Sequence, residues 1–247
     1  MALLEVRDLL KRFGGITAVS GVSFDLDTGE TLGLIGPNGA GKTALINLVS
    51  GFYAGAQGSI RFNGQEILNR PIQEIARAGI ARTFQNIKLF GRMTVLENVM
   101  VASKADAMHP LRSFFRLRHG AQVDRAMEYL RLTNLAAKAD QRANSLAYGE
   151  ARRLEIARAL AGEPRLLVMD EPAAGMNERE SEELVELIRV CRTRVDAVLL
   201  IEHDIALVRA LSTRLVAMDN GAKIADGLPD AVLADEGVRK AYIGDDE

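Results

Sequence analysis

Cysteine is almost absent from this chain, and so are long apolar stretches and an excess of charge of either sign. The 247 residues include one cysteine, Cys191, so an internal disulfide is excluded and the composition suits a reducing compartment. We interpret Cys191 as a small helix residue rather than a reactive thiol. The formal net charge of -2 gives no overall attraction for nucleic acid, so we expect no nucleic-acid partner.

The chain also lacks the features of a membrane-spanning or secreted protein. The longest clear apolar run, residues 197–201, is far shorter than the roughly 20 residues that a membrane-spanning helix needs. Charged residues appear from Glu5 onward, too early for a secretory signal. We therefore expect a soluble protein that acts at a membrane only by docking to an embedded partner.

One glycine-rich stretch carries the strongest signal in the sequence. Residues 36–43 read Gly-Pro-Asn-Gly-Ala-Gly-Lys-Thr, which fits the phosphate-binding P-loop pattern G-x-x-x-x-G-K-[ST]. The glycines let backbone N–H groups turn toward one anion, Lys42 brings positive charge to the terminal phosphates, and the Thr43 hydroxyl can reach magnesium. Residues 30–35 predict a buried strand, and residues 44–49 predict a helix whose N-terminus faces the phosphate. The expected nucleotide-binding residues here are Gly36, Pro37, Asn38, Gly39, Ala40, Gly41, Lys42, Thr43 and Ala44.

Around this loop the sequence changes between strand and helix patterns. Alternating segments before residue 35 predict strands, and residues 58–64 predict another that closes on an Asn-Gly turn. From about residue 72 to 162 apolar residues recur mostly at helical spacing, interrupted at 103–120 by a basic stretch that we interpret as a solvated surface loop. The later elements are predicted strands at 165–171, 197–201, 214–218 and 222–225, and a helix at 178–190.

These patterns predict an α/β fold of the P-loop NTPase kind: a mainly parallel sheet core, an N-terminal antiparallel β sub-domain and an inserted helical sub-domain. The chain between Lys42 and Asp170 is far longer than one strand–helix crossover requires, so a sub-domain must be inserted there. We assign residues 1–85 and 163–247 to the core and about 86–162 to the helical sub-domain, within one domain. No internal repeat is visible.

Polar residues end two of the predicted buried strands. A P-loop protein needs an acid at the end of a neighbouring strand to hold magnesium, and Asp170 has that position. Glu171 could orient a water or take its proton, and the alternative is a solvated strand end. His203 follows another strand on what should be the same sheet edge, where a phosphate contact is favoured over a structural role. Gln85 lies where the β-rich part gives way to the helical part.

A second glycine beside a helix start indicates a second anion site. Residues 146–150 read Leu-Ala-Tyr-Gly-Glu and come directly before a helical pattern. One chain with two phosphate-binding helix ends suggests that two chains share two nucleotides. The order of P-loop, glutamine, this signature, paired acids and histidine resembles the ATP-binding cassette (ABC) ATPases, over essentially the full chain.

The resemblance implies ATP and Mg²⁺ as cofactors and a role for each motif. Phe13, which could otherwise pack on the sheet, would stack on adenine. The signature of one subunit would close over the γ-phosphate held by the other, and residues 173–177 would cross the dimer interface. The implied signature contacts are Leu146, Ala147, Tyr148, Gly149 and Glu150. The implied catalytic residues are Glu171, His203, Gln85 and Lys42, and the implied metal-binding residues are Thr43, Gln85 and Asp170.

Three segments narrow the resemblance to importers of branched-chain amino acids, and within these to the LivG type. They are residues 79–86, 93–99 and 241–244. The resemblance implies an ATPase subunit on the inner face of the cell membrane, with membrane permease subunits, a second ATPase subunit (in a homodimer or heterodimer) and, indirectly, a solute-binding protein as partners. The apolar residues 87–90 are the expected permease contact.

Other functions stay open. The same machine could carry another cargo, such as urea or other amino acids. Two alternatives belong to other functional classes. One is a soluble cassette ATPase that acts on DNA or ribosomes, and the other is a regulatory nucleotide switch with little turnover.

Three positions depart from the family's pattern. Ala147 lacks the signature hydroxyl, Glu150 replaces a neutral Gln, and Asn177 replaces the usual Asp of the interface loop. All three fall on the surface offered to the partner subunit. We hypothesise that the two ATP sites of the working dimer are unequal, and equal turnover by the homodimer and a mixed dimer would contradict this.

Overall fold

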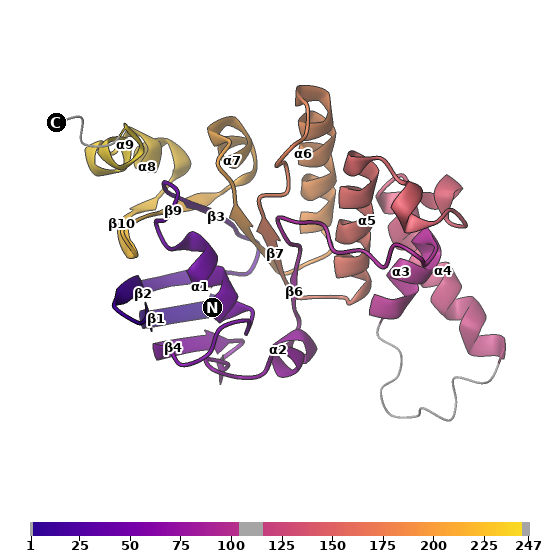
Figure 1. Cartoon of the computed structure of the whole chain (residues 1–247), viewed down its shortest axis with the longest axis horizontal. Helices are drawn as coiled ribbons and strands as arrows, with labels where there is room; N and C mark the ends of the chain where they lie inside the picture. The colour runs from indigo at the N-terminus through magenta and orange to yellow at the C-terminus, as the bar shows by residue number, and fades with distance from the viewer. Residues whose placement is uncertain (1, 104–115, 244–247) are drawn as a thin grey trace.

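The computed structural model describes residues 2–103 and 116–243. An antiparallel sheet and a larger, mainly parallel sheet form the core, and a group of helices lies to one side of it (Figure 1). The antiparallel sheet has the strand order β2-β1-β4-β5, and its strands are β1 (Ala2–Phe13), β2 (Ile16–Asp27), β4 (Gln57–Phe62) and β5 (Gln65–Glu66). The predicted α/β fold class is confirmed.

The larger sheet has the strand order β10-β9-β3-β8-β7-β6, with only the β9–β10 pair antiparallel. Its strands are β3 (Thr31–Ile35), β6 (Ile80–Arg82), β7 (Leu166–Asp170), β8 (Ala197–Ile201), β9 (Arg214–Asp219) and β10 (Ala222–Gly227). Every residue of β3, β7 and β8 is buried, because both faces of these central strands are covered. Leu166 and Val168 pack toward the antiparallel sheet and α1, whereas Leu167 and Met169 pack toward α5, α6 and α7.

The helices divide between the core and the side group. The core helices are α1 (Lys42–Val49), α2 (Ile72–Ala78), α6 (Glu178–Arg192), α7 (Ile205–Leu211), α8 (Pro229–Ala234) and α9 (Glu236–Ile243). The side group contains α3 (Val95–Ala102), α4 (Arg116–Leu132), η2 (Ala136–Lys138), η3 (Ala143–Ser145) and α5 (Tyr148–Ala161). Its apolar centre includes Val95, Val99, Leu130 and Leu154. Within the described residues, no helix has the length and apolar character needed to cross a membrane.

Two sequence predictions need correction. The helical pattern predicted from residue 72 holds over α2 but is wrong at residues 80–82, where β6 pairs in parallel with β7. This strand has three residues, too few to show a period, and its backbone partners come from β7. Of the basic stretch 103–120, residues 104–115 lie outside the described part, and residues 116–120 begin α4 rather than continuing a loop.

Candidate active site

Three strands of the larger sheet end at the same level. Leu34 of β3 and Asp170 of β7 both pair with Ile201 of β8. Because these strands are parallel, the chain leaves all three at one edge of the sheet, which is the edge where ligands bind in open α/β folds. The P-loop, Glu171 and His203 follow these strands, so the register brings them together.

The P-loop needs glycine at its two ends for steric reasons. Gly36 has φ 146° and Gly41 has φ 98°, both in the region that favours glycine. A Cβ atom on Gly36 would overlap the carbonyl oxygen of Met218, and one on Gly41 would overlap that of Ala18. The loop is therefore pressed against β9 and β2 at these two glycines, and α1 begins at Lys42, directly after Gly41.

Lys42 lies within the loop rather than in solvent. Its side-chain ammonium donates to the carbonyl oxygens of Gly36 (2.5 Å) and Pro37 (2.9 Å), and the residue is 5% exposed. Burial lowers the pKa of Lys42, and the negative charges of Glu171 and Asp170 oppose that shift. The charges of Asp170, the last residue of β7, and of Glu171, directly after it, therefore act on the ammonium.

Glu171 connects two of the other expected site residues. It has a left-handed backbone (φ 47°), uncommon for a residue with a side chain, which turns the chain sharply after β7. One carboxylate oxygen accepts a hydrogen bond from the Gln85 amide at 2.6 Å, and the other lies 2.5 Å from His203 Nε2. Gln85, Glu171 and His203 come from three separate segments, and the structure brings all three side chains into contact.

Asp170 has a buried partner that the sequence analysis missed. Arg82, the last residue of β6, forms an ion pair with Asp170 at 2.8 Å, and both side chains are less than a tenth exposed. Arg82 also donates to Asn47 and lies beside the rings of Phe52 and Phe84, 5.4 and 5.1 Å from their centroids, and these two rings meet edge-on. The guanidinium thus fixes the Asp170 carboxylate and connects it to the residue that precedes Gln85.

The oxygen donors near the loop are suited to magnesium. Thr43, exposed at the start of α1, and Gln85 each offer a neutral oxygen, and Asp170 offers a carboxylate. The described residues contain no group of three His, Cys, Asp or Glu side chains that could hold a metal ion. Magnesium fits such a sparse donor set, because it usually takes one or two carboxylates and fills its shell with phosphate and water.

The signature residues, Leu146 to Glu150, lie at the N-terminus of α5. Ala147 offers no side-chain acceptor, but its own N–H donates to the Glu150 carboxylate at 3.2 Å. Glu150 also pairs with Lys138 at 2.5 Å, and this hydrogen bond lowers the pKa of Glu150. The additional negative charge at position 150 is therefore balanced within the same chain. Gly149 is buried, and a Cβ atom there would press on Glu180 of α6.

The expected interface loop, residues 173–177, is held by side chains from two other segments, Tyr148 of α5 and Glu202 after β8. Tyr148 donates its hydroxyl hydrogen to the Ala174 carbonyl oxygen at 2.7 Å. The buried Glu202 accepts from the Ala173 N–H at 2.8 Å, and burial raises the pKa of Glu202. Asn177 caps α6 by accepting from the Glu180 N–H at 3.0 Å, a role that Asp would also perform.

A second buried arginine, Arg152, connects α5 to the segment around Gln85. Its guanidinium donates to the carbonyl oxygens of Phe84 (2.5 Å) and Gln85 (2.8 Å) and pairs with Glu155 at 2.6 Å. A further, longer contact of 3.4 Å reaches the Tyr148 hydroxyl. Arg152 is fully buried, although the charge-rich sequence of α5 gave no sign of it.

Phe13 ends β1, in the hairpin that it forms with β2. Its ring is 42% exposed and meets Tyr53 edge-on at 5.0 Å, with the Lys11 ammonium 4.8 Å from the ring centroid. Ala18, on the next strand of the same hairpin, approaches Gly41. The ring is therefore not packed into the core.

The comparison with known protein families agrees with this geometry. The family model described as ABC transporter matches residues 19–174. The chain belongs to the ABC transporter family. The cassette is an ATP-binding, ATP-hydrolysing unit, as the resemblance implied. A second model, described as branched-chain amino acid ATP-binding cassette transporter, matches residues 222–247.

Individual relatives cover nearly the whole cassette. It is 44% identical to the high-affinity branched-chain amino acid transport ATP-binding protein BraF of Pseudomonas aeruginosa and 42% identical to LivG of Escherichia coli K12, each over 98% of both chains. Among solved structures, a nucleotide-free ATP-binding cassette from an ABC transporter has a TM-score of 0.87 and 32% identity, covering 99% of this chain and all of that one. A cassette described in its ADP conformation has a TM-score of 0.85 and 31% identity, with the same coverage.

Proposed function

We propose that this chain is the ATP-hydrolysing subunit of a membrane importer for branched-chain amino acids. Two observations support the cargo: the names of the relatives with 42–44% identity, and the branched-chain family model at the C-terminus. The contact of Glu171 with Gln85 and His203, opposite Lys42, supports the chemistry.

In this proposal Glu171 is the general base. Its carboxylate orients a water toward the γ-phosphate and takes a proton from it as the water attacks. Gln85 and His203 hold the carboxylate in place, and His203 is exposed enough to contact the phosphate as well. Lys42 stabilises the negative charge that moves onto the phosphate oxygens.

Thr43, Gln85 and Asp170 would hold magnesium at the phosphates. When bound, the ion neutralises phosphate charge and fixes the phosphate geometry. Arg82 keeps the Asp170 carboxylate in position for that role through their buried ion pair. Phe13 offers its exposed ring to the adenine base.

The partners in this proposal are a second ATPase subunit, permease subunits and, indirectly, a solute-binding protein, with the cassette at the inner face of the cell membrane. The helix α5, which begins in the signature, contacts α3, α4, α6 and β6, and the signature would serve the nucleotide of the second subunit. ATP binding would close the dimer and hydrolysis would reopen it, and these movements would be passed to the permease.

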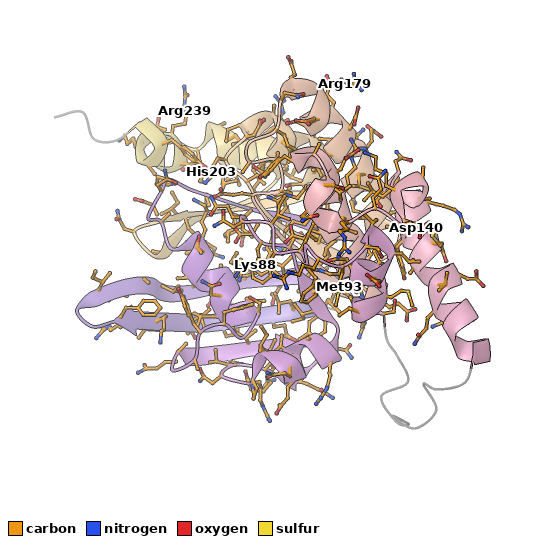
Figure 2. All side chains as sticks on the ribbon, turned by 45° about the vertical axis from the view of Figure 1, so that its right-hand side comes forward. Lys88, Met93, Asp140, Arg179, His203 and Arg239 are labelled. Atoms are coloured by element: carbon orange, nitrogen blue, oxygen red, sulfur yellow. The ribbon has the colours of Figure 1, made fainter. Side chains whose placement is uncertain are left out.

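A groove between the core and the side group of helices supports the permease contact. It has a volume of about 710 Å³ and is lined mostly by apolar side chains, among them Phe52, Ile75 and Phe84, with Arg158 at one side. Arg158 lies over the ring of Phe90, 5.6 Å from its centroid, and this ring is 48% exposed. In Figure 2, Lys88 lies near the middle of the molecule and Met93 beside the helical part, so the segment carrying Phe90 crosses this junction.

Replacing Glu171 with Gln tests the proposed chemistry. The amide keeps the size of the side chain but cannot accept the proton, so we expect the turnover rate to fall by about 10²- to 10⁴-fold. ATP affinity should stay close to the wild-type value, and gel filtration should show an ATP-bound dimer that persists. Rapid hydrolysis by E171Q would contradict the assignment of Glu171 as the base.

The matched control is Glu186→Gln. This residue is exposed on α6, and its ion pair with Arg189 lies on the surface. We expect wild-type turnover from E186Q.

A further inference from the structure

The first residue of the P-loop is held by a side chain from the far end of the sequence. The backbone N–H of Gly36 donates a hydrogen bond of 2.8 Å to the hydroxyl oxygen of Tyr242, 206 residues further along the chain. Gly36 is buried at the point where β3 becomes the loop. A buried backbone N–H requires a partner, and here the partner belongs to α9.

Packing places α9 independently of this hydrogen bond. Val238 is 2% exposed and belongs to an apolar cluster with Ile35, the residue before Gly36, and with Val232 of α8. Residues four apart lie on the same face of a helix, so the face that binds the core also carries Tyr242. Tyr242 is 39% exposed, and its partial burial raises the pKa of the hydroxyl, which stays neutral at physiological pH.

The other side of Gly36 leads to the phosphate site. Its carbonyl oxygen accepts the 2.5 Å hydrogen bond from the Lys42 ammonium. Gly36 therefore lies between the Tyr242 hydroxyl and the Lys42 ammonium. It has little freedom to move elsewhere, since Met218 and Ala40 close the space beside its α-carbon.

We propose that Tyr242 is a positioning residue for the nucleotide site, which acts through Gly36 to fix Lys42 where the terminal phosphates bind. This rests on the proposed function, in which Lys42 binds those phosphates. It gives the segment matched by the branched-chain family model, residues 222–247, a direct effect on nucleotide affinity. A change in the position of α9 on the core would therefore change the position of Gly36 and Lys42 in the P-loop.

The test is Tyr242→Phe, which keeps the ring and its packing and removes only the hydroxyl. The dissociation constant for Mg-ADP is measured by calorimetry, so no hydrolysis interferes, together with the melting temperature of the nucleotide-free protein. We expect the dissociation constant to rise about three- to tenfold, the range that one lost intramolecular hydrogen bond accounts for. Tyr129→Phe, which removes a hydroxyl from α4 in the helical part, should leave the constant unchanged.

Equal dissociation constants for wild-type protein and Y242F would overturn the role of Tyr242, as would a fall in melting temperature with no change in affinity, since that marks a purely structural contact. A comparable loss in Y129F would overturn it too. Failure of the wild-type protein to take up nucleotide is a different result, because it would remove the proposed nucleotide site itself.

Discussion

In the part of the chain that the structure describes, buried charged side chains have partners, and several of these partners come from another segment. Lys42 has the P-loop carbonyls and Asp170 has Arg82, while Glu202 accepts backbone hydrogen bonds from residues after β7 and β8. An isolated buried charge is strongly destabilising, so each pairing fixes one loop relative to another. The active site is thus held together by contacts between separate segments. Glu171 makes two of these contacts, one with Gln85 and one with His203.

Cys191 permits a prediction at the residue scale. The thiol is fully buried on α6, and burial raises its pKa to about 12. At pH 8 only about one molecule in 10⁴ would carry the reactive thiolate. We therefore expect iodoacetamide to leave the native protein unlabelled over an hour and to label it fully in urea, as followed by mass spectrometry. Fast labelling of the folded protein would show that α6 opens or that the thiol is accessible.

At the scale of elements, α5 connects the loops of the nucleotide site. Its first turn carries the signature, Tyr148 reaches the interface loop, and Arg152 holds the carbonyl oxygens of Phe84 and Gln85. A movement of Gln85 on nucleotide binding would therefore be passed to α5 through the Arg152 guanidinium. Because Arg152 and Glu155 are one turn apart on the same face, the helix itself supplies the balancing charge.

Arg152→Lys should weaken the connection between Gln85 and α5 without weakening nucleotide binding. A lysine keeps the charge near Glu155, but a single ammonium cannot reproduce the planar fork that reaches two carbonyl oxygens. We expect about tenfold slower ATP hydrolysis with an unchanged dissociation constant for Mg-ADP, measured on the same preparation. The matched change Arg189→Lys, at an exposed ion pair on α6, should alter neither value. Wild-type hydrolysis by R152K would show that α5 and Gln85 are not coupled through this side chain.

The elements themselves differ in how far the sequence could predict them. The central strands β3, β7 and β8 were predicted to within a residue, because each is a short apolar run buried on both faces. The positions of the P-loop, Asp170 and His203 at the ends of these strands could be predicted from the same pattern. Arg82, Arg152 and Tyr242 did not, since their partners lie 88, 68 and 206 residues away and only the folded packing brings them together. The site roles of Phe13, the signature and the metal ligands stay predictions.

At the scale of the whole molecule, the groove between the core and the side group is the surface on which the proposed transport role depends. It is bordered by α2 and β6 on one side and by α5 on the other, so a shift of the helices would change its width. A partner seated there would contact both parts at once. ATP hydrolysis at the P-loop would then change the shape of the groove, and with it the contacts that the partner makes there.

Phe90→Ser should uncouple hydrolysis from transport. Its ring is exposed beside Arg158 of α5 and is not one of the residues assigned to the nucleotide site, so ATP hydrolysis by the isolated cassette should remain near wild type. Loss of one aromatic anchor at an interface costs about 2 kcal/mol or more, which corresponds to about 30-fold weaker binding. We expect uptake of branched-chain amino acids in cells to fall by at least tenfold. Val190→Ser, at an exposed apolar position on α6, is the control, and unchanged uptake by F90S would contradict the docking site.

The Lys42 ammonium already donates to the carbonyl oxygens of Gly36 and Pro37, in a loop that lies close against β9 and β2 at Gly36 and Gly41. An incoming triphosphate would therefore meet a lysine that is already positioned in the loop. Little rotamer freedom is left for the lysine to lose, which reduces the entropic penalty of association. The adaptable parts of the cassette are then the segments that close over the nucleotide, and the pocket that first receives it is rigid.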